Sequence, residues 1–167
     1  HRMTGHGGDV ESVAFHPNGE YVVSGAADFA VILWNTATGE QVRRFVGHRS
    51  PVRSVAFTPD GDHILSGSRG VAGGEPLIIL WDVETGEQVR TYEAHSAGVQ
   101  TIAVSPDNQT FLSGARDGEL ILWDLNSGES VRNLVGHATA VEDVAYGPDG
   151  MRAVSASGDG TIIIWSL

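Results

Sequence analysis

Histidine, serine and aspartate recur together in this chain, and these are the three side chains of a hydrolytic triad. His6, His48, His95 and His137 stand 42 to 47 residues apart. A serine follows each histidine, and in three of the four copies an aspartate lies four residues after that serine. Because histidine can pass a proton between a carboxylate and a hydroxyl, the pattern raises the question of nucleophilic catalysis by serine.

The recurrence itself argues against catalysis. A nucleophile occupies a single site, whereas this set of side chains returns in copy after copy. The sequence also contains no Gly-x-Ser-x-Gly elbow, the strained turn that presents a catalytic serine in many hydrolases. We therefore expect no catalytic residue in this chain.

The elements around these side chains repeat as well. In the first copy, an alternating apolar run over Val10–Phe15 predicts a half-buried strand, and Pro17 then begins a turn. A second strand ends in small residues at 24–26, and a third, at 31–34, is almost wholly apolar. A fourth run, 41–46, carries two arginines in a pattern typical of an exposed edge.

Four antiparallel strands in each repeat of about 42 residues describe one blade of a β-propeller. A Gly-His pair opens three of the repeats and Ala94-His95 opens the third, and each repeat has a tryptophan near its end that aspartate follows in two copies and Asn35 or Ser166 in the others. These pairs resemble the Gly-His and Trp-Asp signature of the WD40-repeat family, whose repeat is about 40–45 residues long. The resemblance covers essentially the whole chain and implies an all-β fold of four blades. Their approximate bounds are 5–46, 47–93, 94–135 and 136–167.

The resemblance also implies that a hydrogen-bonded His–Ser–Asp–Trp quartet holds each blade together. Three blades offer all four side chains, which are His6, Ser24, Asp28 and Trp34, then His95, Ser113, Asp117 and Trp123, and finally His137, Ser155, Asp159 and Trp165. The second blade offers His48, Ser66 and Trp81. It lacks the aspartate, and although Glu75 could stand in, we interpret this quartet as weakened.

Five extra residues lengthen the second blade between Ser66 and Trp81. The inserted segment, 69–75, is rich in glycine, but the Gly-Lys-Ser/Thr of a phosphate-binding loop does not follow it. We expect a mobile loop there, with a partner-contacting loop as the alternative. The other histidines, His1, His16 and His63, show no metal-ligand spacing. The sequence therefore predicts neither a cofactor nor a metal site.

A propeller of this family implies a docking platform, so we expect a non-enzymatic scaffold for protein partners. In the family, contacts concentrate on the face that carries the loops before the first strand and between the second and third strands. The charged and polar residues at these places are Asp9, Glu11, Arg53, Gln100, Arg116 and Glu142. The two arginines suit acidic groups of a partner. Less favoured alternatives are an enzyme that uses the central channel and a lectin-like binder.

The amino-acid composition argues against two classes of partner, nucleic acids and membranes. The net charge of −11 argues against nucleic-acid binding, which needs a basic surface. The longest apolar runs hold five or six residues, far short of the ~20 that a membrane helix requires. The chain has no cysteine, which fits a reducing compartment. We expect a cytoplasmic protein without nucleic-acid or membrane partners.

The two ends of the chain fall inside one blade. Alignment of Gly5-His6 with Gly47-His48 places residues 1–4 at the position of an outer strand, whereas residues 165–167 close an inner strand. Family propellers close by joining such ends, usually with seven or eight blades. We expect a homodimeric eight-bladed ring in which the N-terminal strand 1–4 of each copy completes the last blade of the other. The alternative, favoured by a start at His1 rather than Met, is a piece of a larger regulatory protein's propeller.

Overall fold

The computed structural model describes residues 1–70, 77–93 and 95–167, and within them every regular element is a β-strand. In chain order the strands are β1 (Val10–Phe15), β2 (Tyr21–Ala26), β3 (Val31–Asn35), β4 (Gln41–Phe45), β5 (Val52–Phe57), β6 (His63–Ser68), β7 (Ile78–Asp82), β8 (Gln88–Tyr92), β9 (Val99–Val104), β10 (Thr110–Ala115), β11 (Leu120–Asp124), β12 (Ser130–Leu134), β13 (Val141–Tyr146), β14 (Arg152–Ser157) and β15 (Ile162–Ser166).

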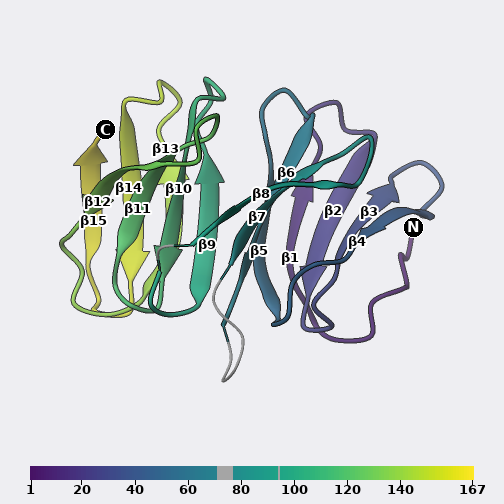
Figure 1. The fold of residues 1–167 in the computed structure, drawn as a ribbon, viewed down its shortest axis with the longest axis horizontal. Coiled ribbons are helices and arrows are strands. Elements are labelled where there is room, and N and C mark those ends of the chain that lie inside the picture. The colour runs from purple at the N-terminus through teal and green to yellow at the C-terminus, as the bar shows by residue number, and fades with distance from the viewer. Residues whose placement is uncertain (71–76, 94) are drawn as a thin grey trace.

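These strands form four separate antiparallel sheets, each built from consecutive strands. Blades 1, 2 and 3 are the four-stranded sheets β1–β4, β5–β8 and β9–β12, and blade 4 is the three-stranded sheet β13–β15. The sheets stand side by side in chain order, with the N-terminus and the C-terminus at opposite ends of the row (Figure 1). The predicted all-β class and the antiparallel blades are confirmed.

The turn between the first and second strand of each blade needs one residue in the left-handed region of the backbone. Gly19, Gly61 and Gly150 take it with φ between 70° and 83°, and Asn108 takes it in blade 3 with φ of 61°. Glycine and asparagine tolerate this conformation better than other residues do, so the proline-initiated turns predicted from the sequence follow from local chemistry.

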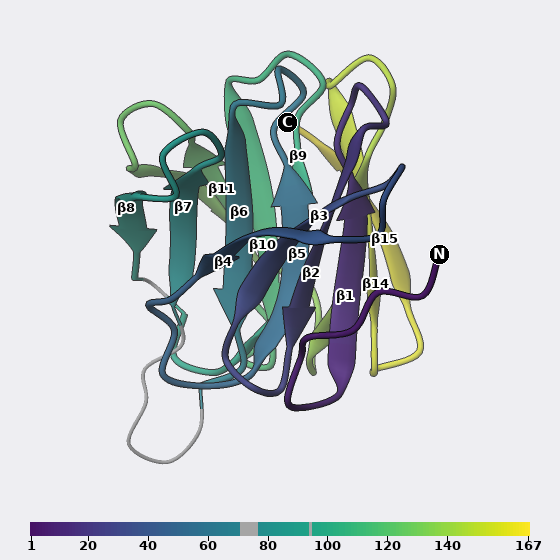
Figure 2. The same cartoon turned by 90° about the vertical axis from the view of Figure 1, so that its right-hand side faces the viewer.

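The hydrophobic cores lie between neighbouring sheets. Between blades 1 and 2, Leu33 and Phe45 on one side meet Val55, Phe57 and Trp81 on the other. The same arrangement recurs between blades 2 and 3 and between blades 3 and 4. Figure 2 looks at the row from the side of blade 1 and presents the sheets one behind another. Each sheet therefore relies on its neighbour to bury its apolar face.

The two outermost sheets have one neighbour each, and large apolar side chains on their outer faces are exposed. Phe15 in β1 is 71% exposed, whereas Phe57, at the same position of blade 2, is 8% exposed. At the other end Ile164 in β15 is 72% exposed, whereas Leu80, its counterpart in β7, is 5% exposed. The third strand of blade 4 is therefore not buried on both faces as an apolar run predicts, because no fifth sheet covers it.

The predicted N-terminal strand 1–4 is unpaired in the single chain. Residues 1–9, all of which the structure describes, contain no strand. The segment nevertheless lies against blade 1, in the position that the fourth strand of one blade takes against the following blade. Met3 packs beside Trp34, as Phe45 packs beside Trp81. The segment lacks strand geometry because the chain itself provides no strand for it to pair with.

Inter-sheet burial predicts different costs for two equivalent phenylalanines. Phe57→Ala removes a side chain from the core between blades 1 and 2 and should lower the free energy of unfolding by about 3–5 kcal/mol. Phe15→Ala should change it by less than about 0.5 kcal/mol in dilute solution, because that ring faces solvent. Urea unfolding measures both values. Equal losses in the two variants would contradict packing between sheets as the source of stability.

Candidate functional site

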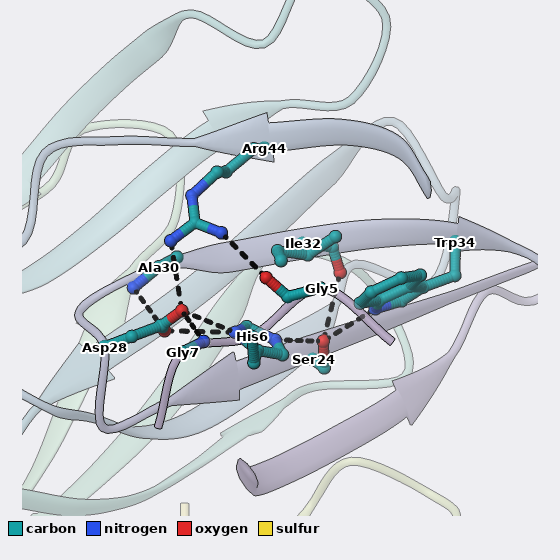
Figure 3. Close-up of polar contacts among 9 residues, drawn as sticks. All are labelled: Gly5, His6, Gly7, Ser24, Asp28, Ala30, Ile32, Trp34 and Arg44. Atoms are coloured by element: carbon teal, nitrogen blue, oxygen red, sulfur yellow. Dashed lines mark hydrogen bonds and ion pairs between the residues drawn. The ribbon is translucent and has the colours of Figure 1, made fainter. Parts of the chain in front are cut away.

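The histidine, serine, aspartate and tryptophan of blade 1 form one continuous hydrogen-bonded chain (Figure 3). His6 Nδ1 lies 3.0 Å from Asp28 Oδ1, and His6 Nε2 lies 2.7 Å from Ser24 Oγ. The indole N–H of Trp34 donates to the same Ser24 oxygen over 2.7 Å. The quartet thereby links the segment before β1 to β2 and β3.

The carboxylate of Asp28 collects further donors. The amide of Gly7 donates to it over 2.9 Å, and the guanidinium of Arg44 in β4 lies 3.0 Å from it. Burial raises the pKa of Asp28, but hydrogen bonds from the Gly7 amide and from His6 outweigh burial and lower the pKa to about 2. The carboxylate is therefore ionised at neutral pH and holds the loop before β1 against the turn between β2 and β3.

Blades 3 and 4 repeat this geometry. His95 Nδ1 lies 3.2 Å from Asp117, and His95 Nε2 lies 2.7 Å from Ser113, whose oxygen accepts from Trp123 Nε1 over 2.8 Å. In blade 4 the corresponding contacts are 3.2, 2.7 and 2.8 Å, among His137, Asp159, Ser155 and Trp165. The three complete quartets are thus equivalent in position and in contacts.

Serine, histidine and aspartate are hydrogen-bonded in the same order as in a hydrolytic triad, but the serine hydroxyl is not accessible to a substrate. Ser24 is 4% exposed, and Ser113 is fully buried. Each hydroxyl oxygen already accepts a hydrogen bond from a tryptophan of its own blade. A nucleophile must reach the substrate, and these oxygens lie beneath the blade surface. The geometry is that of a structural clamp.

Blade 2 has the inner half of the quartet alone. His48 Nε2 lies 2.6 Å from Ser66 Oγ, and Trp81 Nε1 donates to Ser66 over 2.7 Å. His48 Nδ1 is buried and has no hydrogen-bond partner among the residues that the structure describes. Burial lowers the pKa of His48 to about 4, so its ring is neutral at neutral pH. The expectations for Glu75 and for the inserted loop fall largely on residues 71–76, which lie outside the described residues.

Four residues of the predicted partner face share one backbone feature. Each lies five residues after its blade's histidine, at a point where the pairing of the first two strands skips a residue, as between Val10 and Ser12. Such a β-bulge turns the extra side chain away from its regular direction. We call these four the bulge residues, and they are Glu11, Arg53, Gln100 and Glu142.

The bulge residues contact one another across blades. Arg53 forms an ion pair with Glu11, and Arg69 adds a second cation 3.7 Å from the same carboxylate. Gln100 Nε2 donates to Glu142 Oε2 over 3.0 Å. The sequence predicted that Arg53 binds acidic groups of a partner, but in the structure its guanidinium already pairs with Glu11.

The other two predicted face residues, Asp9 and Arg116, are exposed. Their backbones are fixed, since the Asp9 carbonyl accepts from the Ala27 amide and the Arg116 amide donates to the Gly98 carbonyl. No hydrogen bond or ion pair engages the Arg116 side chain within the described part of the chain. Arg116 is therefore the face arginine that the fold leaves accessible.

The sequence analysis did not predict a second role of arginine, in which arginines on the outer strands donate to backbone carbonyls of the next blade. Arg43 in β4 donates to the carbonyls of Glu84 and Thr85 in blade 2 over 2.7 and 2.6 Å. Arg90 in β8 makes the same type of contact with blade 3. The signal was present, because an arginine stands five residues before His48, His95 and His137. These arginines tie each outer strand to the next blade.

One group in the described residues brings three metal-ligand atoms within 4.8 Å of one another, and it consists of His95, Asp117 and Glu119. Two of these side chains belong to the blade 3 quartet. Both ring nitrogens of His95 are already engaged there, one with Ser113 and one with Asp117. The cluster is therefore part of the structural clamp.

Comparison with known families identifies the repeat. A family model for the WD domain, G-beta repeat, matches residues 1–35, 39–82, 86–124 and 128–166, which is nearly the whole chain. The comparison with curated proteins found no match. In the described residues, no helix is long and apolar enough to cross a membrane.

The quartet geometry predicts a structural cost for loss of the Asp28 charge. Asp28→Asn should lower the free energy of unfolding at pH 7 by about 1–3 kcal/mol, because it weakens charge-assisted bonds to His6 and the Gly7 amide. The pKa of Asp28 is depressed in the folded state, so the wild-type chain loses this contribution as pH falls from about 4 towards 2.

Urea unfolding between pH 7 and pH 3 measures this effect. The variant should lack that part of the acid-dependent loss of stability. Asp62→Asn, which removes the same charge from an exposed turn, is the matched control. If both variants unfold alike at every pH, the quartet does not stabilise the blade as described.

Proposed function

Because the chain belongs to the WD40-repeat family, we propose that it is a non-enzymatic scaffold that docks protein partners and closes its ring by pairing with a second copy. The burial of each quartet serine beneath the blade surface carries the non-enzymatic part of this proposal. We further propose a cytoplasmic location, supported by a composition free of cysteine.

The proposed docking face is the one that carries the loops before each first strand. Asp9 and Arg116 offer exposed charges of opposite sign there, while the bulge residues beside them are held by contacts between blades. A rigid face with a few accessible charges suits recognition of a protein surface. Arg116 is the residue best placed to receive an acidic group of a partner, because a guanidinium can bind a carboxylate through two hydrogen bonds.

Self-association is supported by the matching residues on the two open flanks. Ile162 and Ile164 occupy the positions at which Ile78 and Leu80 pack against blade 3. Val10, Val13 and Phe15 occupy the positions at which Val52, Val55 and Phe57 receive blade 1. Each flank is thus one half of an inter-sheet core, and a second copy supplies the other half.

The N-terminal segment supplies the remaining piece of this junction. Met3 stands three residues before His6. In the same way Phe45, Tyr92 and Leu134, which close the three internal cores, stand three residues before the histidine of the following blade. Residues 1–4 of one copy would pair with β15 of the other and give blade 4 its fourth strand. A larger chain whose further blades cover the same flanks is the alternative, and the solution mass separates the two.

Closure by a second copy predicts a dimer that depends on the open flanks. The 17.7 kDa chain should show a mass about twice that value in light scattering at micromolar concentration. Ile164→Asp should restore the single-chain mass, because it places a charge in the core that the two copies share. Val89→Asp is the matched control, since Val89 is exposed on an outer strand away from both flanks. A wild-type mass of 17.7 kDa at this concentration would refute self-association.

The docking face predicts that a change at Arg116 alters which proteins bind. In a pull-down, Arg116→Glu should lose proteins that the wild-type chain retains. Arg152→Glu, at an arginine that is also exposed but lies on β14 beside Asp149, should retain them. The same proteins bound by all three chains would exclude Arg116 from the docking surface.

A further inference from the structure

The bulge residues lie in the first strands of the blades, and they contact one another at two junctions inside the chain, between blades 1 and 2 and between blades 3 and 4. Glu11 of blade 1 meets Arg53 of blade 2, a cation. Glu142 of blade 4 meets Gln100 of blade 3, a neutral donor. In both cases a carboxylate faces a donor, so these side chains help to join neighbouring blades.

The closing junction of the proposed ring has a different composition. If a second copy continues the row with the same geometry, its Glu11 takes the place next to Glu142, because both lie five residues after a blade histidine. Two carboxylates then face each other at each of the two closing junctions. Like charges at adjacent positions of neighbouring strands oppose association.

The groups around these two carboxylates leave Glu142 without a cation, since both arginines at the junction are engaged by Glu11. Glu11 is already shared between Arg53 and Arg69 within its own chain. Glu142 is exposed and receives a hydrogen bond from Gln100, which carries no charge. Glu142 therefore brings an uncompensated negative charge to the junction.

Asp143, the next residue, would find a hydrogen-bond donor at the closing junction. It occupies the position of Ser12 and Ser54, whose hydroxyl oxygens accept from the amides of Val55 and Ile102 in the following blade. At the closing junction a carboxylate oxygen of Asp143 would accept from the Val13 amide of the second copy. Asp143 thus has a hydrogen-bond donor at the closing junction, whereas Glu142 meets another carboxylate.

We propose that Glu142 limits the strength of self-association and favours a neighbouring blade with a basic residue at the bulge position over the chain's own first blade. This inference rests on the proposed closure by a second copy. Neutralisation of Glu142 or screening by salt then strengthens the dimer. Neither neutralisation of Glu142 nor added salt changes the apolar surface of the blade 4 flank, because Ile162 and Ile164 remain in place.

The test compares dissociation constants from sedimentation equilibrium for the wild-type chain, Glu142→Gln and Glu142→Arg. Glu142→Gln should bind its copy about three- to tenfold more tightly, since each ring has two closing junctions. Glu142→Arg should be at least as tight, because the amide oxygen of Gln100, which has no hydrogen-bond partner among the described residues, can accept from the new guanidinium. Glu129→Gln removes the same charge from an exposed hairpin and should leave the constant unchanged.

Salt gives a second readout. Raising sodium chloride from 50 to 300 mM should tighten the wild-type dimer more than the Glu142→Gln dimer, because screening removes a repulsion that the variant lacks. Dimers of equal strength and equal salt response would overturn the role of Glu142 and leave self-association standing. Single-chain masses for the wild type and both Glu142 variants would overturn self-association and this inference together.

Discussion

The structure depends on apolar packing between neighbouring sheets. The three large cores in the described residues lie between sheets, where one apolar face of a sheet is buried by the first strand and the tryptophan of the next. Three such cores hold four blades, and several residue positions that are buried inside the row, such as those of Phe15 and Ile164, are exposed at its ends. The exposed flanks are therefore a direct consequence of the way in which the blades are stabilised.

The quartets illustrate how burial decides the use of reactive side chains. The order carboxylate, imidazole, hydroxyl is the order of a hydrolytic triad, and the distances of about 3 Å would permit proton transfer. Here the hydroxyl is buried and receives the indole N–H of a tryptophan, so the same groups fix the loop before each first strand. Three of the four blades therefore hold this loop through a complete quartet.

Local signals in the sequence accounted for most of the fold. The alternating runs and the proline-initiated turns predicted the strands, and a four-fold repeat with regular spacing predicted separate blades. Contacts between blades were less accessible to sequence reading. The pairing of Arg53 with Glu11 depends on a β-bulge, and the hydrogen bond that Arg43 donates reaches a carbonyl about 40 positions away in the sequence. The solvent exposure of β15 follows from a missing neighbour, which its apolar sequence cannot reveal.

The central claim is that the two open flanks are halves of one inter-sheet core, joined when two copies meet. Amide hydrogen exchange tests this claim most directly at residues 2–4 and at the β15 amides that point away from β14. The account predicts that both groups gain protection together as the protein concentration rises through the dimer range, while the outer edges of β4 and β8 do not. Protection that is independent of concentration in both groups would contradict it.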